Sequence, residues 1–153
     1  MDNIDHVQKA KDLFKEGYNC AQAVFLAFSD LYDIDFDTAA RIMSPFGGGM
    51  GRMREVCGAV SGMFTALGFL YGYDDPKNIT VKKELYSQVQ ELAAGFKEEN
   101  YSIVCREIFQ EGAIDTDPMN TKRDADFYKK RPCAEYVASA AELMQEFINK
   151  HPL

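Results

Sequence analysis

The sequence has very little histidine and lacks the motifs of several enzyme classes. Its two histidines, His6 and His151, lie near the ends of the chain, where we expect solvated side chains. There is no His-Glu-x-x-His motif and no evident Ser, His and Asp set, so hydrolase chemistry has little support. Because Cys-x-x-Cys-His is absent as well, we expect no haem.

Basic residues are scarce relative to acidic ones. The 153 residues include 17 Lys and Arg against 24 Asp and Glu, which gives a formal net charge of −7. Because nucleic-acid affinity depends on clustered basic side chains, we expect no nucleic-acid partner. The N-terminus lacks the basic start and apolar run of a secretory signal, which predicts a cytoplasmic protein. Structural disulfides are rare in that reducing compartment.

The chain also lacks β-branched runs bounded by turn residues, which argues against a sheet. Apolar residues instead recur at helical spacing through nearly the whole chain. The uncharged stretch 56–73 reaches the lower limit of a membrane span, but it contains four glycines and other helices need an apolar partner. We therefore predict no membrane span. The expected fold is all-α, a compact single domain over residues 1–153 with six or seven helices around a central uncharged helix.

Capping and breaking residues set the predicted helix boundaries. Gly17 should end the first helix, Asn19 should cap the second, and the residue before Pro45 should end the third. The predicted helices cover residues 4–16, 20–31, 37–43, 56–73, 78–96, 102–109 and 132–148. The uncharged helix carries a stripe of small residues that would let another backbone approach closely: Gly58, Gly62 and Ala66.

Four cysteines stand where the sequence predicts that helices begin: Cys20, Cys57, Cys105 and Cys133. A helix start has unpaired backbone N–H groups and the positive end of the helix dipole, which favour a thiolate over a thiol. We expect this effect to lower the pKa of each thiol by about one unit. Nearby basic residues should add to it: Arg52 and Arg54 for Cys57, Arg106 for Cys105, and residues 129–131 for Cys133.

The spacing of the cysteines does not select one chemistry. No Cys-x-x-Cys occurs, so neither a thioredoxin-type pair nor a zinc-ribbon site is predicted. A helical bundle can still assemble a site from separate helices. Two thiolates about 4 Å apart repel by about 4 kcal/mol at an effective dielectric constant of about 20. This repulsion exceeds the stabilisation that one helix dipole gives to a thiolate. Converging sulfurs must therefore form disulfides, stay partly protonated, or bind zinc or an iron–sulfur centre.

One glycine-dense loop, residues 46–51, precedes the uncharged helix. It follows no predicted strand and does not match the P-loop pattern, so it predicts no nucleotide site. Its backbone N–H groups and the nearby arginines form a candidate anion or cofactor site: Gly47, Gly48, Gly49, Gly51, Arg52 and Arg54. Alternatively, the glycines bring the loop close to Cys57 and leave its sulfur approachable.

Residues 57–62 read Cys-Gly-Ala-Val-Ser-Gly, with one further cysteine before this motif and two after it. This pattern resembles the family of redox-active proteins named for the motif C_GCAxxG_C_C, and the resemblance spans residues 20–133. It implies that all four cysteines belong to the functional site. The family is related to a domain of split-Soret cytochromes in which an iron–sulfur centre has been described, so the resemblance implies that cofactor as an option.

Three functions are compatible with the sequence. The leading one is thiol redox chemistry, as in a thiol-dependent oxidoreductase, in which Cys57 reacts first and another cysteine resolves the product. Its redox partner is not identified by the sequence. The second is a metal- or iron–sulfur-binding protein whose ligands are Cys20, Cys57, Cys105 and Cys133. The third is a structural or interaction module, such as a homo-oligomer, with buried cysteines that act as small hydrophobic residues.

Overall fold

The computed structural model describes residues 4–108, 116–119 and 132–153, and these residues form helices and no strand. Six of the helices contain at least eight residues: α1 (His6–Glu16), α2 (Cys20–Ala27), α3 (Phe36–Met43), α5 (Gly58–Tyr71), α6 (Ile79–Asn100) and α9 (Cys133–Lys150). Short helical turns lie between some of them: η1 (Ser29–Leu31), η2 (Ser44–Phe46), α4 (Gly47–Met50) and α7 (Cys105–Ile108). The all-α prediction is therefore confirmed.

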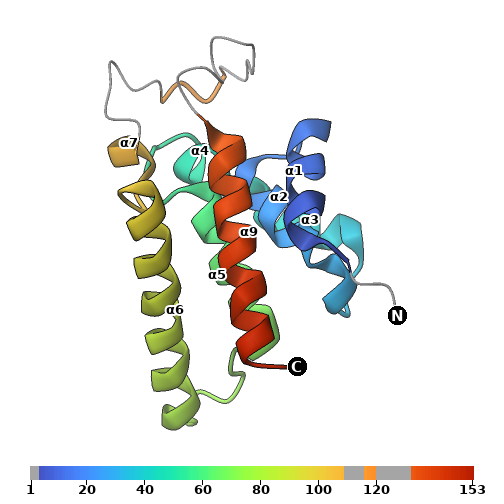
Figure 1. Ribbon diagram of the computed structural model, residues 1–153, viewed down its shortest axis with the longest axis vertical. Coiled ribbons are helices and arrows are strands. Elements are labelled where there is room, and N and C mark those ends of the chain that lie inside the picture. Colours follow the sequence, from blue (N-terminus) through green and yellow to red (C-terminus); the bar gives the residue numbers. More distant parts are fainter. Residues whose placement is uncertain (1–3, 109–115, 120–131) are drawn as a thin grey trace.

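The uncharged helix α5 packs against α2, α6 and α9. In Figure 1, α5, α6 and α9 run along the long axis of the molecule. Helices α1, α2 and α3 lie to the right of α9 in this view. Helix α2 contacts α1, α3, α5 and α9, and six of its eight residues are buried. The central position predicted for α5 is thus shared with α2.

The capping residues act largely as the sequence predicts. Gly17 ends α1 with a φ of 117°, a left-handed conformation that glycine adopts without steric cost. Asn19 and Gln22 form a capping box at the start of α2, with reciprocal hydrogen bonds of 2.9 and 3.1 Å. Helix α2 ends at Ala27, earlier than predicted, because the chain tightens into the 3₁₀ turn η1, where the N–H of Leu31 donates to the Phe28 carbonyl.

The small residues of α5 allow a close approach to α2, as predicted. A Cβ atom at Gly62 would lie 2.5 Å from the Ala21 carbonyl oxygen and 3.0 Å from Cβ of Val24. A Cβ atom at Gly58 would lie 3.2 Å from the backbone nitrogen of Ala21. Because the first turn of α5 is held so close to the first turn of α2, the residues that begin these two helices are brought together.

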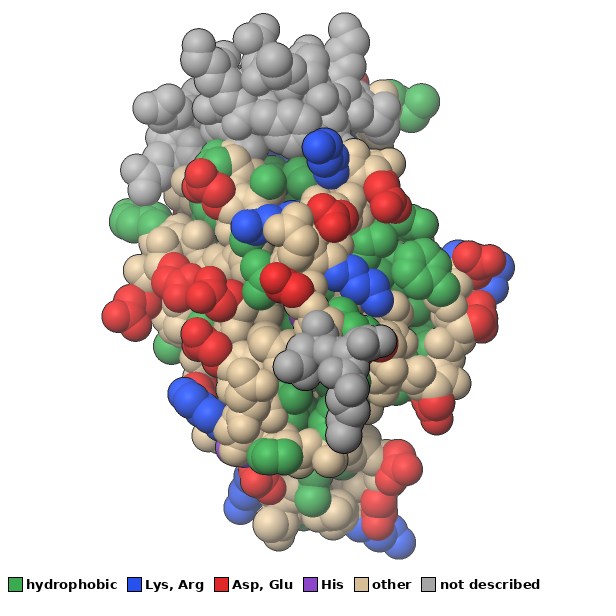
Figure 2. Space-filling model, turned by 45° about the vertical axis from the view of Figure 1, so that its right-hand side comes forward, with side chains coloured by type: hydrophobic (Ala, Val, Ile, Leu, Met, Phe, Trp, Pro, Cys, Tyr) green, Lys and Arg blue, Asp and Glu red, His purple; other side chains and the backbone are tan. Residues whose placement is uncertain are grey.

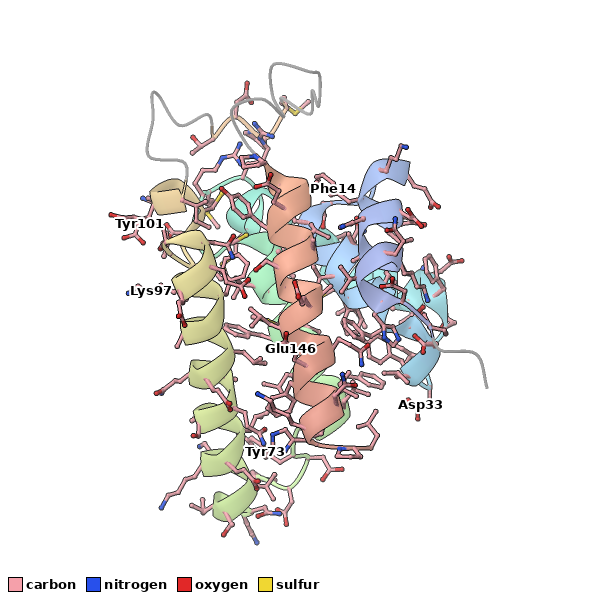
Figure 3. All side chains as sticks on the ribbon, in the orientation of Figure 1. Phe14, Asp33, Tyr73, Lys97, Tyr101 and Glu146 are labelled. Atoms are coloured by element: carbon pink, nitrogen blue, oxygen red, sulfur yellow. The ribbon has the colours of Figure 1, made fainter. Side chains whose placement is uncertain are left out.

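Helix α6 is buried mainly in its second half. Asn78 caps it by accepting a hydrogen bond of 3.2 Å from the Val81 N–H. Leu92 and Phe96 are buried, whereas three other apolar residues at helical spacing, Val81, Leu85 and Val89, are only half-buried. Figure 3 shows the charged side chain of Lys97 pointing away from the neighbouring helices.

The surface is of mixed character, and Figure 2 shows acidic, basic and hydrophobic side chains interspersed over one face. None of the helices within the described residues has the length and apolar character needed to cross a membrane.

The expectation that the His6 side chain is solvated is wrong. Its side chain is buried, stacks on Phe28, and forms hydrogen bonds with Asp30 and Gln145. This burial arises because α1 packs against both α2 and α9.

Candidate functional site

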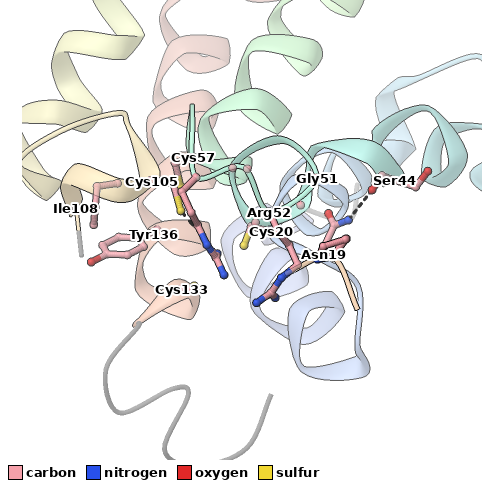
Figure 4. Close-up of a pocket in the computed structure, with 16 residues that line it drawn as sticks. Asn19, Cys20, Ser44, Gly51, Arg52, Cys57, Cys105, Ile108, Cys133 and Tyr136 are labelled. Atoms are coloured by element: carbon pink, nitrogen blue, oxygen red, sulfur yellow. Dashed lines mark hydrogen bonds between the residues drawn. The ribbon is translucent and has the colours of Figure 1, made fainter. Parts of the chain in front are cut away.

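The four cysteines lie at four helix starts and line one cavity of about 350 Å³. Three of them are the first residues of helices, Cys20 in α2, Cys105 in α7 and Cys133 in α9. Cys57 is the residue that immediately precedes α5. The positions predicted from the sequence are therefore confirmed, and Figure 4 shows residues from all four helix starts around the same space.

Backbone contacts explain how distant cysteines meet. Val56 and Val104 form an isolated antiparallel bridge. The Cys57 N–H donates to the Ile103 carbonyl at 2.8 Å, and the Cys105 N–H donates to the Glu55 carbonyl at 2.6 Å. The segments that precede α5 and α7 are thus paired, which places Cys57 beside Cys105.

Cys20 joins this group through the close contact between α2 and α5. A Cβ atom at Gly58 would lie 3.2 Å from the Cβ atom of Cys20. Cys133 completes the group from the start of α9, where the neighbouring Cys20 thiol is the largest cause of the raised pKa of Cys133. None of the four cysteines forms a disulfide in this structure.

The cysteines differ in exposure. Cys57 and Cys105 are each 5% exposed and Cys133 is 8% exposed, whereas Cys20 is partly exposed. A molecule that enters the cavity therefore reaches Cys20 more readily than the other three sulfurs. The sequence could not rank the four in this way, because their burial depends on packing between separate helices.

The predicted lowering of thiol pKa is wrong for Cys57 and Cys133. Burial raises the pKa of Cys57, with a further contribution from the Cys20 charge, and the N–H groups of Ala59 and Val60 oppose this rise only in part. The pKa of Cys133 is raised mainly by its hydrogen bond with Cys20, and burial adds to this effect. At both positions desolvation and neighbouring sulfurs raise the thiol pKa by more than the helix start lowers it. Both thiols therefore stay protonated at neutral pH.

The arginines near the cysteines are arranged differently from the sequence prediction. Arg54 is 3% exposed, and its Nη1 atom donates to Sγ of Cys105 at 3.9 Å, although the sequence pairs it with Cys57. Arg106, which the sequence pairs with Cys105, instead donates hydrogen bonds to the Glu55 carboxylate and to the Arg54 carbonyl. The basic residues at 129–131 lie outside the described residues. Because Arg54 and Cys105 are far apart in the chain, no local pattern indicates their contact.

The glycine-dense segment forms a left-handed turn. Six residues in this segment and just after it have positive φ angles: 67° at Gly48, 71° at Gly49, 65° at Met50, 59° at Gly51, 68° at Arg52 and 60° at Arg54. Left-handed conformations cost about 1–2 kcal/mol for each non-glycine residue, and such strain is often found at functional sites. The segment was expected to be a loop, but the Gly51 N–H donates to the Gly47 carbonyl and closes a helical turn, α4.

The candidate anion-site residues all line the cavity: Gly47, Gly48, Gly49, Gly51, Arg52 and Arg54. This segment approaches Cys105 closely, a contact that the sequence did not predict, and it lines the same cavity as Cys57. A Cβ atom at Gly49 would lie 2.8 Å from both the Arg54 Cα atom and the Cys105 Cβ atom. Any side chain at this position would therefore displace the cysteine or the segment that carries Arg54.

The sequence did not single out Tyr136, which also lines the cavity. It lies one turn after Cys133 on α9, a spacing that places two side chains on the same helix face and could have indicated it. Burial raises the pKa of Tyr136 to about 12, with contributions from Cys133 and other nearby groups. Its hydroxyl is therefore protonated at neutral pH.

A single bound metal ion does not match the present positions of the side chains. Among the described residues, which include all four cysteines, there is no group of three or more His, Cys, Asp or Glu side chains that could hold a metal ion. Zinc bound by four thiolates requires every sulfur about 2.3 Å from the metal. The cysteines would have to draw closer together to meet that requirement.

Comparison with known proteins gives one match. The model of a family described as "Putative redox-active protein (C_GCAxxG_C_C)" matches residues 18–147, a span that contains the four cysteines and most of the chain. No curated protein and no solved structure matches the chain. Because the family match covers well over half of the sequence and includes the whole cavity-forming set of cysteines, the chain belongs to the C_GCAxxG_C_C family.

Proposed function

We propose that this chain is a thiol–disulfide redox protein in which Cys20 and Cys133 form the exchanging pair. The observation that carries the proposal is that these two thiols are near enough to interact, inside a cavity that all four cysteines line. Thiol–disulfide exchange needs an accessible attacking sulfur and a second sulfur close enough to displace the product. Cys20 is the accessible sulfur, because it is partly exposed, and Cys133 is the second sulfur close to it.

The roles of the two sulfurs follow from their surroundings. Cys20 attacks one sulfur of a disulfide, which breaks the S–S bond, forms a mixed disulfide with Cys20 and releases one thiol. Cys133 then attacks Cys20 in the mixed disulfide, which forms the Cys20–Cys133 disulfide and releases the second thiol. The protein loses two electrons and two protons, and the disulfide substrate gains them.

The raised pKa of Cys133 determines the order of these two steps. Its hydrogen bond with Cys20 and the Cys20 charge are among the causes of the shift, and both depend on a thiol or thiolate at Cys20. When Cys20 enters a mixed disulfide, it no longer carries a charge, so the pKa of Cys133 falls and its thiolate forms more readily. Cys133 therefore becomes reactive after the first step rather than before it.

Replacement of single cysteines by serine tests this pairing. The protein, purified anaerobically, is treated with a limiting amount of a small disulfide, and its remaining thiols are counted. We expect the wild-type chain and the Cys57→Ser and Cys105→Ser variants to lose two thiols reversibly. The Cys20→Ser and Cys133→Ser variants should lose no pair. Full activity of Cys20→Ser would refute the assignment of the attacking sulfur.

An iron–sulfur protein is the second candidate, with Cys20, Cys57, Cys105 and Cys133 as ligands. The supporting observation is that four cysteines and two arginines line the cavity, whereas none of its described lining residues is acidic. Clusters held by four thiolates are negatively charged, so positive surroundings suit them. Such a group would supply one-electron transfer. Anaerobic purification followed by absorption spectroscopy and iron and sulfide analysis tests this candidate, since stoichiometric iron and sulfide would favour it over thiol exchange.

A further inference from the structure

A second hollow of the surface, separate from the cysteine cavity, lies along α9. Helix α9 packs against both α1 and α6, and the groove between these two helices has a volume of about 630 Å³. Phe14 lines it from α1 and lies beside the first half of α9 (Figure 3). Two small residues of α9, Ala134 and Ala138, line it as well. No cysteine is among its described lining residues, so this groove has no part in the thiol chemistry proposed above.

The two helices that form most of this groove present opposite charges to it. Lys11 and Lys15 lie about one turn apart on α1, and Glu135 and Glu142 lie about two turns apart on α9. All four side chains are exposed. None of them forms an ion pair with another described residue of the chain. A partner that enters the groove can therefore meet a basic side and an acidic side at once.

We propose that this groove is the interface of a homodimer, in which α1 of each copy lies in the groove of the other. A two-fold axis parallel to α1 and α9 places the basic side of one groove against the acidic side of the other. The lysines of α1 then face the glutamates of α9 in the second copy, and the same contact forms again on the other side of the axis. The charge pattern of the groove is thus complementary to itself.

Helices α1 and α9 are antiparallel, which is needed for this pairing. His6, at the start of α1, is hydrogen-bonded to Gln145 in the second half of α9. Lys15, near the end of α1, lines the same groove as Glu135 in the first turn of α9. A rotation about an axis parallel to the helices preserves their directions. Helix α1 of the second copy is therefore also antiparallel to α9 of the first.

The charges also match in their levels along the helices, because the proposed rotation leaves every residue at its own level. We count from the contact of His6 with α9, with a rise of about 1.5 Å per residue. This count places Lys15 within about 2 Å of the level of Glu135. It places Lys11 within about 3 Å of the level of Glu142. Each lysine therefore lies opposite one glutamate of the second copy.

The shape of the groove suits a helix. Ala134 and Ala138 have small side chains, so α1 of the second copy can approach α9 closely. The helices α1 and α9 of both copies then form a bundle of four helices with antiparallel neighbours. Because α1 has 11 residues and is about 16 Å long, the contact area falls at the small end of specific interfaces. We therefore expect a weak dimer.

Other charges near the groove do not disturb this pattern. Asp12 and Glu16 are neighbours of the lysines on α1, but they do not line the groove. Glu99 lines it from the end of α6, and its carboxylate accepts a hydrogen bond from the Ser139 hydroxyl. Its charge is thus engaged within its own chain.

Charge reversal tests the pairing in two variants of the full chain. Lys11→Glu with Lys15→Glu makes both sides of the groove acidic, and Glu135→Lys with Glu142→Lys makes both sides basic. Sedimentation velocity in dithiothreitol, which prevents disulfides between copies, measures association. We expect the wild-type chain to dimerise with a micromolar dissociation constant. Each variant should raise that constant by at least about tenfold, because like charges then face one another.

A mixture of the two variants gives the sharpest result. In a mixed dimer every acidic side meets a basic side, so the equimolar mixture should associate about as tightly as the wild-type chain. A chain that carries all four reversals exchanges the two signs and should dimerise as well. As a control, Lys77→Glu with Lys83→Glu reverses two exposed charges outside the groove, and it should leave the dissociation constant unchanged.

Salt provides a test that needs no variant. An increase from about 50 to about 500 mM sodium chloride should weaken the wild-type dimer several-fold, because exposed charges are screened. Far-ultraviolet circular dichroism checks that every variant keeps the helical content of the wild-type chain.

Three outcomes would overturn the proposal. The first is a wild-type chain that stays monomeric at millimolar concentration. The second is dimerisation that neither charge reversal nor salt weakens, since another face would then join the copies. The third is a mixture of the two folded variants that remains monomeric.

Discussion

Replacement of Gly49 by alanine provides a sensitive test of how the cavity is built. The added Cβ atom would lie 2.8 Å from Cβ of Cys105, 2.8 Å from Cα of Arg54 and 2.9 Å from the backbone nitrogen of Glu55. Normal contacts between carbon atoms are about 3.5–4.0 Å, so these groups must move apart by roughly 1 Å. The Glu55 N–H is hydrogen-bonded to the Gly49 carbonyl at 2.9 Å, and the required movement strains this bond.

The expected cost has two components. The left-handed backbone at Gly49 costs alanine about 1 kcal/mol relative to glycine, and overpacking against Cys105 and Arg54 adds about 1–3 kcal/mol. Gly51 in the same turn is the matched control, because its φ is 59° and its nearest neighbour would lie 3.8 Å from the new Cβ atom. Gly51→Ala should therefore cost only the backbone component.

Urea unfolding followed by circular dichroism measures both variants under reducing conditions. We expect the free energy of unfolding to fall by about 2–4 kcal/mol in Gly49→Ala and by about 1 kcal/mol in Gly51→Ala. Equal losses in the two variants would refute the close packing of this turn against Cys105. A smaller loss in Gly49→Ala than in Gly51→Ala would do so even more clearly.

Three further predictions concern the remaining contacts and titrations. Gly62→Ala should lower the free energy of unfolding by about 2–4 kcal/mol, because its Cβ atom would meet the Ala21 carbonyl oxygen at 2.5 Å, and unchanged urea unfolding would contradict this packing. Above about pH 8.5 the thiols of the unfolded chain ionise, whereas the raised pKa keeps buried Cys57 and Cys133 protonated in the folded chain. The free energy of unfolding should therefore fall as the pH rises above this value. Thermal unfolding in dithiothreitol should show a pH slope that is smaller in Cys57→Ala by about 1.4 kcal/mol per pH unit near pH 9–10, whereas identical slopes would exclude a raised pKa at this position. Asn19→Ala should cost about 1 kcal/mol through loss of the α2 cap, and urea unfolding without a change in midpoint would show that the cap contributes little.

The helices were predictable because their signals are local. Gly17 and Asn19 act on backbone groups within four residues, and the periodic apolar residues of α9 lie on one continuous face. The contact at Gly62 could also be anticipated, since a stripe of small residues has few uses other than close packing. The positions of the four cysteines at helix starts followed from the same local signals.

The chemistry of the site was less predictable because it depends on long-range contacts. Helix starts predict lowered thiol pKa values, but the burial of Cys57 reverses the sign, and burial arises from the packing of several helices. The contact between Arg54 and Cys105 joins residues that only the paired segments before α5 and α7 bring together. His6 similarly appears terminal in the sequence, yet it is buried where α1 meets α2 and α9.

The most direct test of the proposed function is a redox titration with peptide mapping. The reduced wild-type chain is equilibrated in dithiothreitol buffers of increasing oxidation, its thiols are blocked by alkylation, and its peptides are examined by mass spectrometry. We predict one two-electron transition that links Cys20 to Cys133 and leaves Cys57 and Cys105 as alkylated thiols after unfolding. A first disulfide between any other pair, or four thiols that remain reduced throughout, would contradict the proposed function.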